Sequence, residues 1–407
     1  MSITKQDNSH SNSELGNKLP VCQALSIVRR AGDNLSSAGR SAAGFADGYL
    51  GARLLPVILS ILLGLMACTV SAQAPPRYTV TDLGSLGGQE CDATGLNSKG
   101  QVVGGADTTK HGKGPEFLTN VFVWQNGKMR AVPGLDGSHA FVVAVNSAGQ
   151  MAGAYSADPL KAKFAAALFT LSGKVKLLGG FPATQHGYSL SEAEAVNAKG
   201  QAVGISNNQA FFWSAGKLRR LAPPPGYTAA DAGAINAVGA AAGKANKIGT
   251  GKTATHALLW NPSGQAKDLG VLPGYTDSIA RGINAKGQVA GWVGQTGGTG
   301  VRGLTFRYRA FLWQNGKMRG LGSIPRLPDS KASALNDKGQ VVGNAYHRTD
   351  EAALLWQNGK VYELNKVVPS GSGWKLQNAL VINNNGWIIG NGIHNGIRRG
   401  FLLIPQR

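Results

Sequence analysis

Acidic side chains gather where short apolar strands are expected to begin. Asp92, Glu192 and Asp231 each precede or enter such a strand, and Glu194 lies close to Glu192. If these strands surround a common axis, their carboxylates can converge there and hold a cation or act as an acid/base pair. The favoured alternative is loop charge that balances basic neighbours. The two hypotheses differ in whether the carboxylates meet.

Arginines interleaved with aromatic residues form a second candidate site. The longest connecting segment, residues 294–309, is rich in glycine and ends in such a stretch, and a later connection carries an arginine pair. Guanidinium groups beside aromatic rings suit an anionic glycan, a phosphorylated polymer or a protein. The alternative is a solvated flexible loop. The residues of this candidate ligand surface are Arg302, Arg307, Tyr308, Arg309, Arg398 and Arg399.

Cofactor and metal chemistry has no signature in the sequence. No His-x-x-x-His, Cys-x-x-Cys or EF-hand spacing is present, and no serine lies in a nucleophile elbow. The stretch Gly297–Gly300 lacks the Gly-Lys-Ser/Thr of a phosphate-binding loop. We therefore expect no cofactor and no metal, and we favour a function without catalysis.

One unit, apolar-Asn-x-x-Gly followed by a short apolar stretch and a second glycine, recurs along the chain. Its seven asparagines are Asn97, Asn146, Asn197, Asn236, Asn284, Asn336 and Asn383. A fixed unit of about this length indicates a propeller or a solenoid. Asn-x-x-Gly predicts a hairpin turn whose glycine is left-handed and whose asparagine bonds its own turn. Fourteen of the chain's 58 glycines are the two fixed glycines of these seven units.

Each unit contains four predicted strands, A to D. Strand A ends at the asparagine, strand B follows the turn, and strand C is an apolar run that ends in an aromatic residue. An Asn-Gly turn then leads to strand D in three units, at Asn126, Asn315 and Asn358. Four antiparallel strands per unit make a propeller blade. The tryptophans at the end of strand C are expected to pack between blades: Trp124, Trp213, Trp260, Trp313 and Trp356.

The two ends of the repeat region predict a closed ring. The last unit stops at strand C, residues 401–404, whereas residues 78–84 precede the first strand A and match a strand D. We therefore predict an all-β, seven-bladed propeller of four-stranded antiparallel blades, closed by the N-terminal strand of the mature chain. Closure removes the sheet edges that an open array would expose.

These repeats resemble the HAF family of bacterial extracellular repeats, named for a His-Ala-Phe triplet. The resemblance covers residues 78–407, and His256-Ala257-Leu258 and Arg309-Ala310-Phe311 are degenerate forms of the triplet. It implies export and a repeat fold. It implies no activity and no catalytic residue.

The N-terminal part predicts export. Residues 1–72 comprise a disordered lead and a signal peptide with an apolar region at 54–70, and residues 73–407 form the propeller. Small residues favour cleavage after Ala72 over cleavage after Ala74, which precedes Pro75. Two alternatives remain, lipidation of Cys68 and an uncleaved membrane anchor. We expect a secreted or cell-envelope protein whose only membrane contact is the signal peptide or a lipid on Cys68.

Charge and location together order the functional hypotheses. The chain carries 41 Lys and Arg against 21 Asp and Glu, which favours anionic partners. Export and the lack of an RNA-binding motif exclude nucleic acid from the expected partners. The leading hypothesis is a monomeric, non-enzymatic binding or scaffolding module that contacts an anionic glycan, envelope polymer or protein through the face of its B–C loops. The alternatives are a polysaccharide lyase or hydrolase with an axial acidic site and a structural surface protein without a specific ligand.

Overall fold

A computed structural model describes most of the repeat region. The described residues are 74–108, 119–135, 139–157, 164–182, 190–248, 254–295 and 307–406. The predictions on the signal peptide, on Cys68 and on cleavage after Ala72 lie outside them, as does Arg302. No helix within these ranges is both long and apolar enough to cross a membrane.

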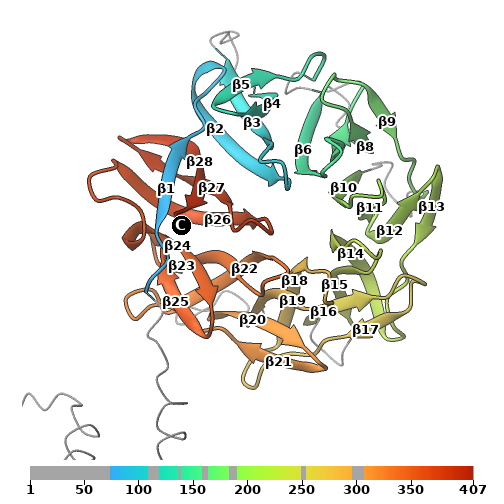
Figure 1. Ribbon diagram of the computed structural model, residues 1–407. Coiled ribbons are helices and arrows are strands. Elements are labelled where there is room, and N and C mark those ends of the chain that lie inside the picture. The colour runs from blue at the N-terminus through green and yellow to red at the C-terminus, as the bar shows by residue number, and fades with distance from the viewer. Residues whose placement is uncertain are drawn as a thin grey trace, which may run out of the picture. The chain divides into compact units, whose positions relative to one another are not determined.

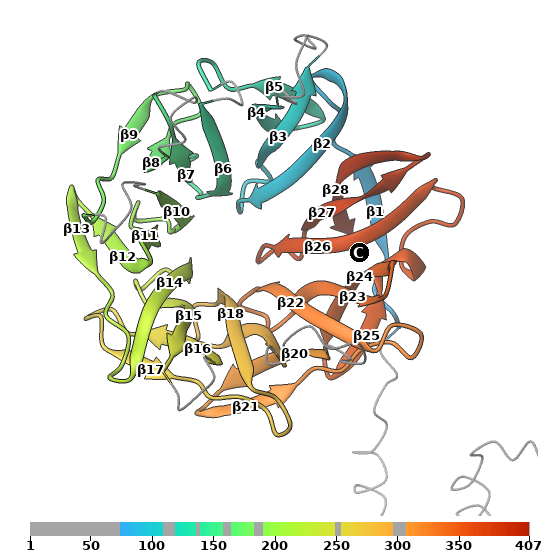
Figure 2. The same cartoon turned by 180° about the vertical axis from the view of Figure 1, so that it is seen from behind.

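The described chain forms seven four-stranded antiparallel sheets around a ring (Figures 1 and 2). Blades 1 and 2 comprise β2 (Gly87–Leu96), β3 (Val102–Thr108), β4 (Thr119–Gln125) and β5 (Lys128–Ala131), then β6 (Ala140–Val145), β7 (Met151–Tyr155), β8 (Ala165–Phe169) and β9 (Val175–Leu177). Blades 3 and 4 comprise β10 (Ser191–Val196), β11 (Ala202–Ser206), β12 (Gln209–Ser214) and β13 (Lys217–Arg220), then β14 (Tyr227–Ile235), β15 (Ala241–Lys247), β16 (Ala254–Trp260) and β17 (Ala266–Asp268).

The remaining three blades repeat this arrangement. Blades 5 and 6 comprise β18 (Asp277–Ile283), β19 (Val289–Gly294), β20 (Tyr308–Gln314) and β21 (Lys317–Gly320), then β22 (Asp329–Leu335), β23 (Val341–His347), β24 (Asp350–Gln357) and β25 (Lys360–Glu363). Blade 7 comprises β26 (Trp374–Ile382), β27 (Ile388–His394), β28 (Ile397–Pro405) and β1 (Tyr78–Asp82). A short 3-10 helix, Leu364–Lys366, leads into blade 7. The predicted fold class is thus confirmed.

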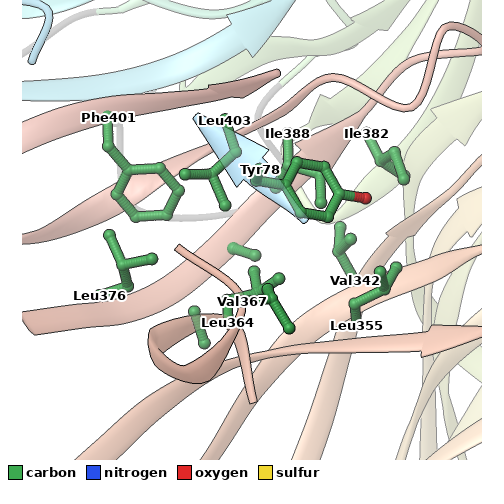
Figure 3. Packing of buried hydrophobic residues seen from close by; sticks show 12 residues of the cluster. Tyr78, Val342, Leu355, Leu364, Val367, Leu376, Ile382, Ile388, Phe401 and Leu403 are labelled. Carbon is green, nitrogen blue, oxygen red and sulfur yellow. The ribbon is translucent and has the colours of Figure 1, made fainter. Parts of the chain in front are cut away.

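Strand β1 closes the ring, as predicted. It pairs with β28 in antiparallel register from Tyr78 opposite Pro405 to Asp82 opposite Phe401. Figure 1 shows this blue N-terminal strand beside the red C-terminal strands. Tyr78 packs with Phe401 and Leu355 in the buried cluster between blades 6 and 7 (Figure 3). Burial raises the pKa of the Tyr78 phenol to about 12.

The turns between strands A and B carry a belt of hydrogen bonds around the ring. Every Asn-x-x-Gly glycine has a positive φ, between 71° and 91°, and each asparagine Oδ1 accepts amide protons of its own turn, as Asn97 does from Lys99 and Gln101. In addition, each asparagine Nδ2 donates to the backbone carbonyl of the next blade's asparagine. The seven bonds, from Asn97 to Asn146 and finally from Asn383 back to Asn97, measure 2.9–3.1 Å. The asparagines therefore join all seven blades, a role beyond the predicted turn bonding.

The second glycine of each unit allows strands A and B to come unusually close. A Cβ on Gly104 would lie 2.0 Å from the carbonyl oxygen of Asp92, and one on Gly243 would lie 1.9 Å from that of Asp231. A β-bulge in strand A lies next to this contact in all seven blades, and it leaves one residue of strand A unpaired. A bulge redirects the side chain of its extra residue. The repeated glycine thus accompanies the feature that shapes the inner wall of the ring.

The strand C tryptophans belong to the core. Trp124, Trp213, Trp260, Trp313 and Trp356 are all buried. Trp260 Nε1 donates to the carbonyl of Ala222 at 2.8 Å, and Trp356 Nε1 donates to that of Gly322 at 3.2 Å. Lys176 of β9 and Lys267 of β17 lie over the indole rings of the next blade's strand C. These basic residues of outer strands thereby contribute contacts between blades.

Candidate binding site in the axial channel

A channel of about 570 Å³ runs between the innermost strands of the seven blades. Each blade contributes the unpaired residue of its bulge to the lining: Thr94, Val143, Glu194, Gly233, Arg281, Ser333 and Leu380. The volume matches that of pockets for small ligands. Because these seven positions differ in chemistry, the channel is asymmetric although its scaffold is repetitive.

The side of the channel formed by blades 3 and 4 is acidic. Glu192 and Glu194 of β10 line it, and Asp231 lies on the adjacent strand β14. Burial, together with Asp231 and Glu192, raises the pKa of Glu194 to about 8, and Arg281 offsets this in part. Burial, followed by the charge of Asp231, also raises the pKa of Glu192. The raised pKa favours the protonated form of Glu194 near neutral pH.

The proton on Glu194 also accounts for an otherwise unpaired oxygen. Asp231 Oδ2 lies 3.5 Å from Lys244 Nζ, whereas the buried Oδ1 finds no ordinary donor among the described residues. A protonated Glu194 carboxyl supplies one, because the two side chains are within hydrogen-bonding reach of each other. Glu194 and Asp231 thus form a carboxyl–carboxylate pair beside the channel.

Blades 5 and 6 contribute a pair of neighbouring basic residues, of which Arg281 lines the channel. Arg281 of β18 lines the channel with its side chain exposed. Lys331 of β22 holds its ammonium over three aromatic rings, 4.7 Å from the centroid of Trp292, 4.0 Å from that of Tyr308 and 5.2 Å from that of Tyr346. Burial, followed by the charge of Arg281, lowers the pKa of Lys331. Within the described ranges neither cation forms an ion pair with a carboxylate.

The residues of the predicted ligand surface near blade 5 separate in the structure. Arg307 is exposed just before β20. Tyr308 turns inward to the ring cage of Lys331, and its amide donates to Asp329 Oδ1 at 2.7 Å. Arg309 points to the other side, where its aliphatic stem covers Gly320 of the outer strand β21. Tyr308 therefore packs in the cage of Lys331, whereas Arg307 and Arg309 lie apart from it.

The arginine pair of blade 7 lies on a strand and not in a connection as predicted, because a tight turn joins β27 and β28 at Asn395, with a φ of 50°. Arg398 Nε donates to Asp92 Oδ1 at 2.9 Å. Arg399 Nε lies 3.9 Å from Asp82 Oδ2. Asp92 therefore pairs with Arg398, whereas Glu192 and Asp231 gather with Glu194.

A second polar cluster lies in blade 4. His256 Nδ1 lies 2.9 Å from Asp268 Oδ2, and the Tyr227 hydroxyl donates to the same oxygen at 2.5 Å. The bonds from His256, Tyr227 and the Gly270 amide lower the pKa of Asp268 against the opposing effect of burial. These bonds tie strands β14, β16 and β17 of one blade together. No His, Cys, Asp or Glu group of three or more in the described part of the chain is arranged to hold a metal ion.

Sequence reasoning alone did not identify Arg281 and Lys331, and it treated Glu194 only as a neighbour of Glu192. A signal for two of the three was present. Arg281 and Glu194 each follow the small residue, Ala280 or Ala193, that pairs with the repeated glycine of strand B. The residue at this position in each of the seven repeats lines the channel. The cage around Lys331 carries no such signal, because its rings come from three strands of two blades.

Comparisons with known proteins show similarity in fold only. No protein-family model matches the chain, and a search of curated proteins gave no match. Solved structures that are similar include the β-propeller domain of the Trilobed protease from Pyrococcus furiosus, at 9% identity over 80% of this chain and 93% of that one, with a TM-score of 0.45. The polysaccharide lyase Uly1 is similar at 9% identity over 84% and 95%, with a TM-score of 0.42. The putative TolB from Agrobacterium tumefaciens is similar at 13% identity over 54% and 74%, with a TM-score of 0.36.

Proposed function

We propose that this propeller is an exported, non-enzymatic binding module that holds an anionic ligand at its axial channel, on the face of the B–C loops. The observation that carries the proposal is the neighbouring pair Arg281 and Lys331. The charge of Arg281 acts on Lys331, and neither cation has a carboxylate partner in the described structure. The two like charges repel each other, Asp329 and Glu351 offset the effect on Lys331 only in part, and a bound anion would relieve the remaining repulsion.

The surroundings of both cations favour recognition of a carboxylate or a similar anion. The guanidinium of Arg281 offers two parallel donors to a planar anion. The three rings around Lys331 restrict its long side chain, so that less conformational entropy is lost when a ligand binds. Phe141 of β6, 37% exposed on strand A of blade 2, offers an apolar surface for a sugar ring. An acidic glycan or envelope polymer fits this combination.

The proposal also includes the cellular location of the protein and its family. We propose a secreted or cell-envelope protein, processed after Ala72 or lipidated at Cys68, that acts as a monomer and belongs to the HAF-type extracellular repeats. N-terminal sequencing and intact mass of the protein recovered from the envelope and the medium would test the processing. A product that begins at Cys68 and carries lipid mass would replace the cleavage after Ala72.

Binding to acidic polysaccharides tests the function. Alginate and polygalacturonate are immobilised beside neutral dextran, and binding is followed as the salt concentration rises. We expect binding to the two acidic polymers that weakens with salt, and a loss of about tenfold in affinity for Arg281→Ala. The matched control is Lys286→Ala, which removes an exposed cation from the A–B turn of the same blade. Equal binding by both variants would contradict the proposal, and no binding to any polymer would favour a structural surface protein.

One observation supports a second candidate, hydrolysis or lyase cleavage of an acidic polysaccharide. Glu194 has a pKa of about 8 beside the carboxylate of Asp231, a pairing suited to a general acid and a general base. Reducing ends and unsaturated products released from the same polymers would reveal such a reaction. Activity abolished by Glu194→Gln would establish the enzyme, whereas polymers that bind and stay intact would eliminate it.

A further inference from the structure

We infer that the ligand group seated in the axial channel is zwitterionic, with an ammonium group close to its carboxylate. The inference rests on the proposed function, since it uses the same Arg281 as the anchor for the anion. It adds a role for the acidic side of the channel, whose carboxylates would repel a ligand that is only an anion. The chemical class is an amino acid, an amino-bearing sugar acid or a peptide end.

The argument begins with the separation of charge inside one cavity. Glu192 and Glu194 line the channel from blade 3, and Arg281 lines it from blade 5. Opposite charges so close normally pair directly, yet among the described residues no ion pair joins Arg281 to either glutamate. The acidic side instead uses a proton and Lys244 to limit its own repulsion. The channel therefore holds an acid and a base apart.

Gly233 leaves the space between Glu194 and Arg281 open. It is the bulge residue of blade 4, between the blades of Glu194 and Arg281, and it lines the channel without a side chain. A Cβ at Gly233 would lie 3.1 Å from Glu194 Oε2 and otherwise in open space. The missing side chain leaves room between the carboxyl and the guanidinium. A ligand whose ammonium faces Glu194 and whose carboxylate faces Arg281 would fill this room.

The proton on Glu194 fixes how binding depends on pH. The charged groups that face Glu194 are Glu192 on its own strand, Asp231 on β14 and Arg281 on β18, and Lys244 lies behind Asp231. An ammonium ligand favours the ionised carboxylate, so it displaces the proton of Glu194 below pH 8. Its affinity should therefore rise with pH until Glu194 is ionised without ligand. A ligand that only accepts or donates neutral hydrogen bonds would show no such rise.

A series of ω-amino acids tests which separation between ammonium and carboxylate fits the channel. Glycine, β-alanine, 4-aminobutyrate and 6-aminohexanoate are titrated into the full chain by ligand-observed NMR at pH 6 and pH 9, each beside the unsubstituted carboxylic acid of equal length. We expect one length to bind about tenfold tighter than its partner at pH 9, with a smaller difference at pH 6. Glu194→Gln should abolish the difference at pH 9. The control Glu90→Gln, at an exposed residue of β2, should keep it.

The outcomes separate this inference from the proposed function. If each amino acid binds no tighter than its partner, or if Glu194→Gln keeps the difference, the zwitterion is wrong. The anion site would then still stand if the plain acids and the polysaccharides depend on Arg281. If nothing in either experiment depends on Arg281, the proposed function fails as well.

Discussion

The C-terminal end of strand A is the same in every blade, whereas its middle differs from blade to blade. At its C-terminal end, the belt of asparagines makes the same bond seven times around the ring. In its middle, the bulge residue occupies the same position in every blade but is a different amino acid each time, for example Glu194, Gly233 and Arg281. The belt shows what a closed ring requires of each repeat. The channel shows where the repeats are free to differ, which is the pattern expected when a rigid scaffold supports a site.

The largest expected effect comes from removing the strand that closes the ring. Deletion of residues 74–84 removes β1 and with it the buried side chains of Tyr78 and Leu83. We expect the free energy of unfolding to fall by about 5 kcal/mol and the exposed edge of β28 to cause association. Chemical unfolding and light scattering measure both changes. Addition of the synthetic 74–84 peptide should restore stability, and failure of that rescue would count against closure by pairing alone.

The second prediction concerns the glycine that accompanies each bulge. Gly243→Ala would put a Cβ 1.9 Å from the carbonyl of Asp231, so strands β14 and β15 must move apart. We expect a loss of about 3 kcal/mol or more in the free energy of unfolding, together with loss of ligand binding. The matched control is Gly127→Ala, in a turn with a φ of 80° and no atom near the new Cβ; it should cost only about 1–2 kcal/mol. Equal costs would show that the close approach is not needed.

The third prediction sets a belt residue against a channel residue. Asn336→Asp keeps the Oδ1 acceptor for its own turn but removes the Nδ2 bonds to Gln340 and to the carbonyl of Asn383. We expect a loss of about 2–4 kcal/mol from these buried bonds and the buried charge. Arg281→Ala should change stability by less than about 0.5 kcal/mol and weaken binding about tenfold. Urea unfolding of both variants would contradict the comparison if Arg281→Ala were the more damaging change.

The belt explains why the fold was predictable. The Asn-x-x-Gly unit, the second glycine and the aromatic end of strand C recur because each is required in every blade, so seven copies reveal them in one sequence. The matching of residues 78–84 to a strand D also predicted closure. The donation from each asparagine to the next blade was not predicted, because one repeat unit does not show which backbone lies beside it.

The channel was only partly predictable for the opposite reason. Glu192 and Asp231 were placed near the axis by their position before strand A, but Asp92 at the equivalent position bonds to Arg398 of a strand that follows 306 residues later. The cage of Lys331 likewise depends on side chains from β19, β20 and β23. Contacts of this kind depend on packing between blades and leave no periodic trace. The lining residues beside the bulges could have been read from the repeat alignment once the bulge was recognised.

The last prediction concerns the dependence of stability on the ionisation of Glu194. Its pKa is about 8 in the folded chain against an ordinary value of 4.5, so the folded state binds more protons than the unfolded state between these values. The stabilisation is fully present below pH 4.5 and is lost as the pH rises through 8. Glu194→Gln keeps a neutral donor for Asp231 at every pH. We expect the variant to match the native protein near pH 5 and to be more stable near pH 9, by at most about 5 kcal/mol, the free energy that corresponds to the difference between the two pKa values.

Thermal unfolding of the native protein, Glu194→Gln and the control Glu90→Gln across pH 5 to 9 measures this dependence. Other groups titrate in the same interval, so the informative quantity is the difference between native protein and variant at each pH. Glu90 is exposed, and its replacement should leave that difference near zero. A constant difference between the native protein and Glu194→Gln would mean that Glu194 is ionised throughout. The acidic side of the channel would then carry its full negative charge at neutral pH, and the contrast between a neutral belt and a charged channel would be sharper than the carboxyl–carboxylate pair implies.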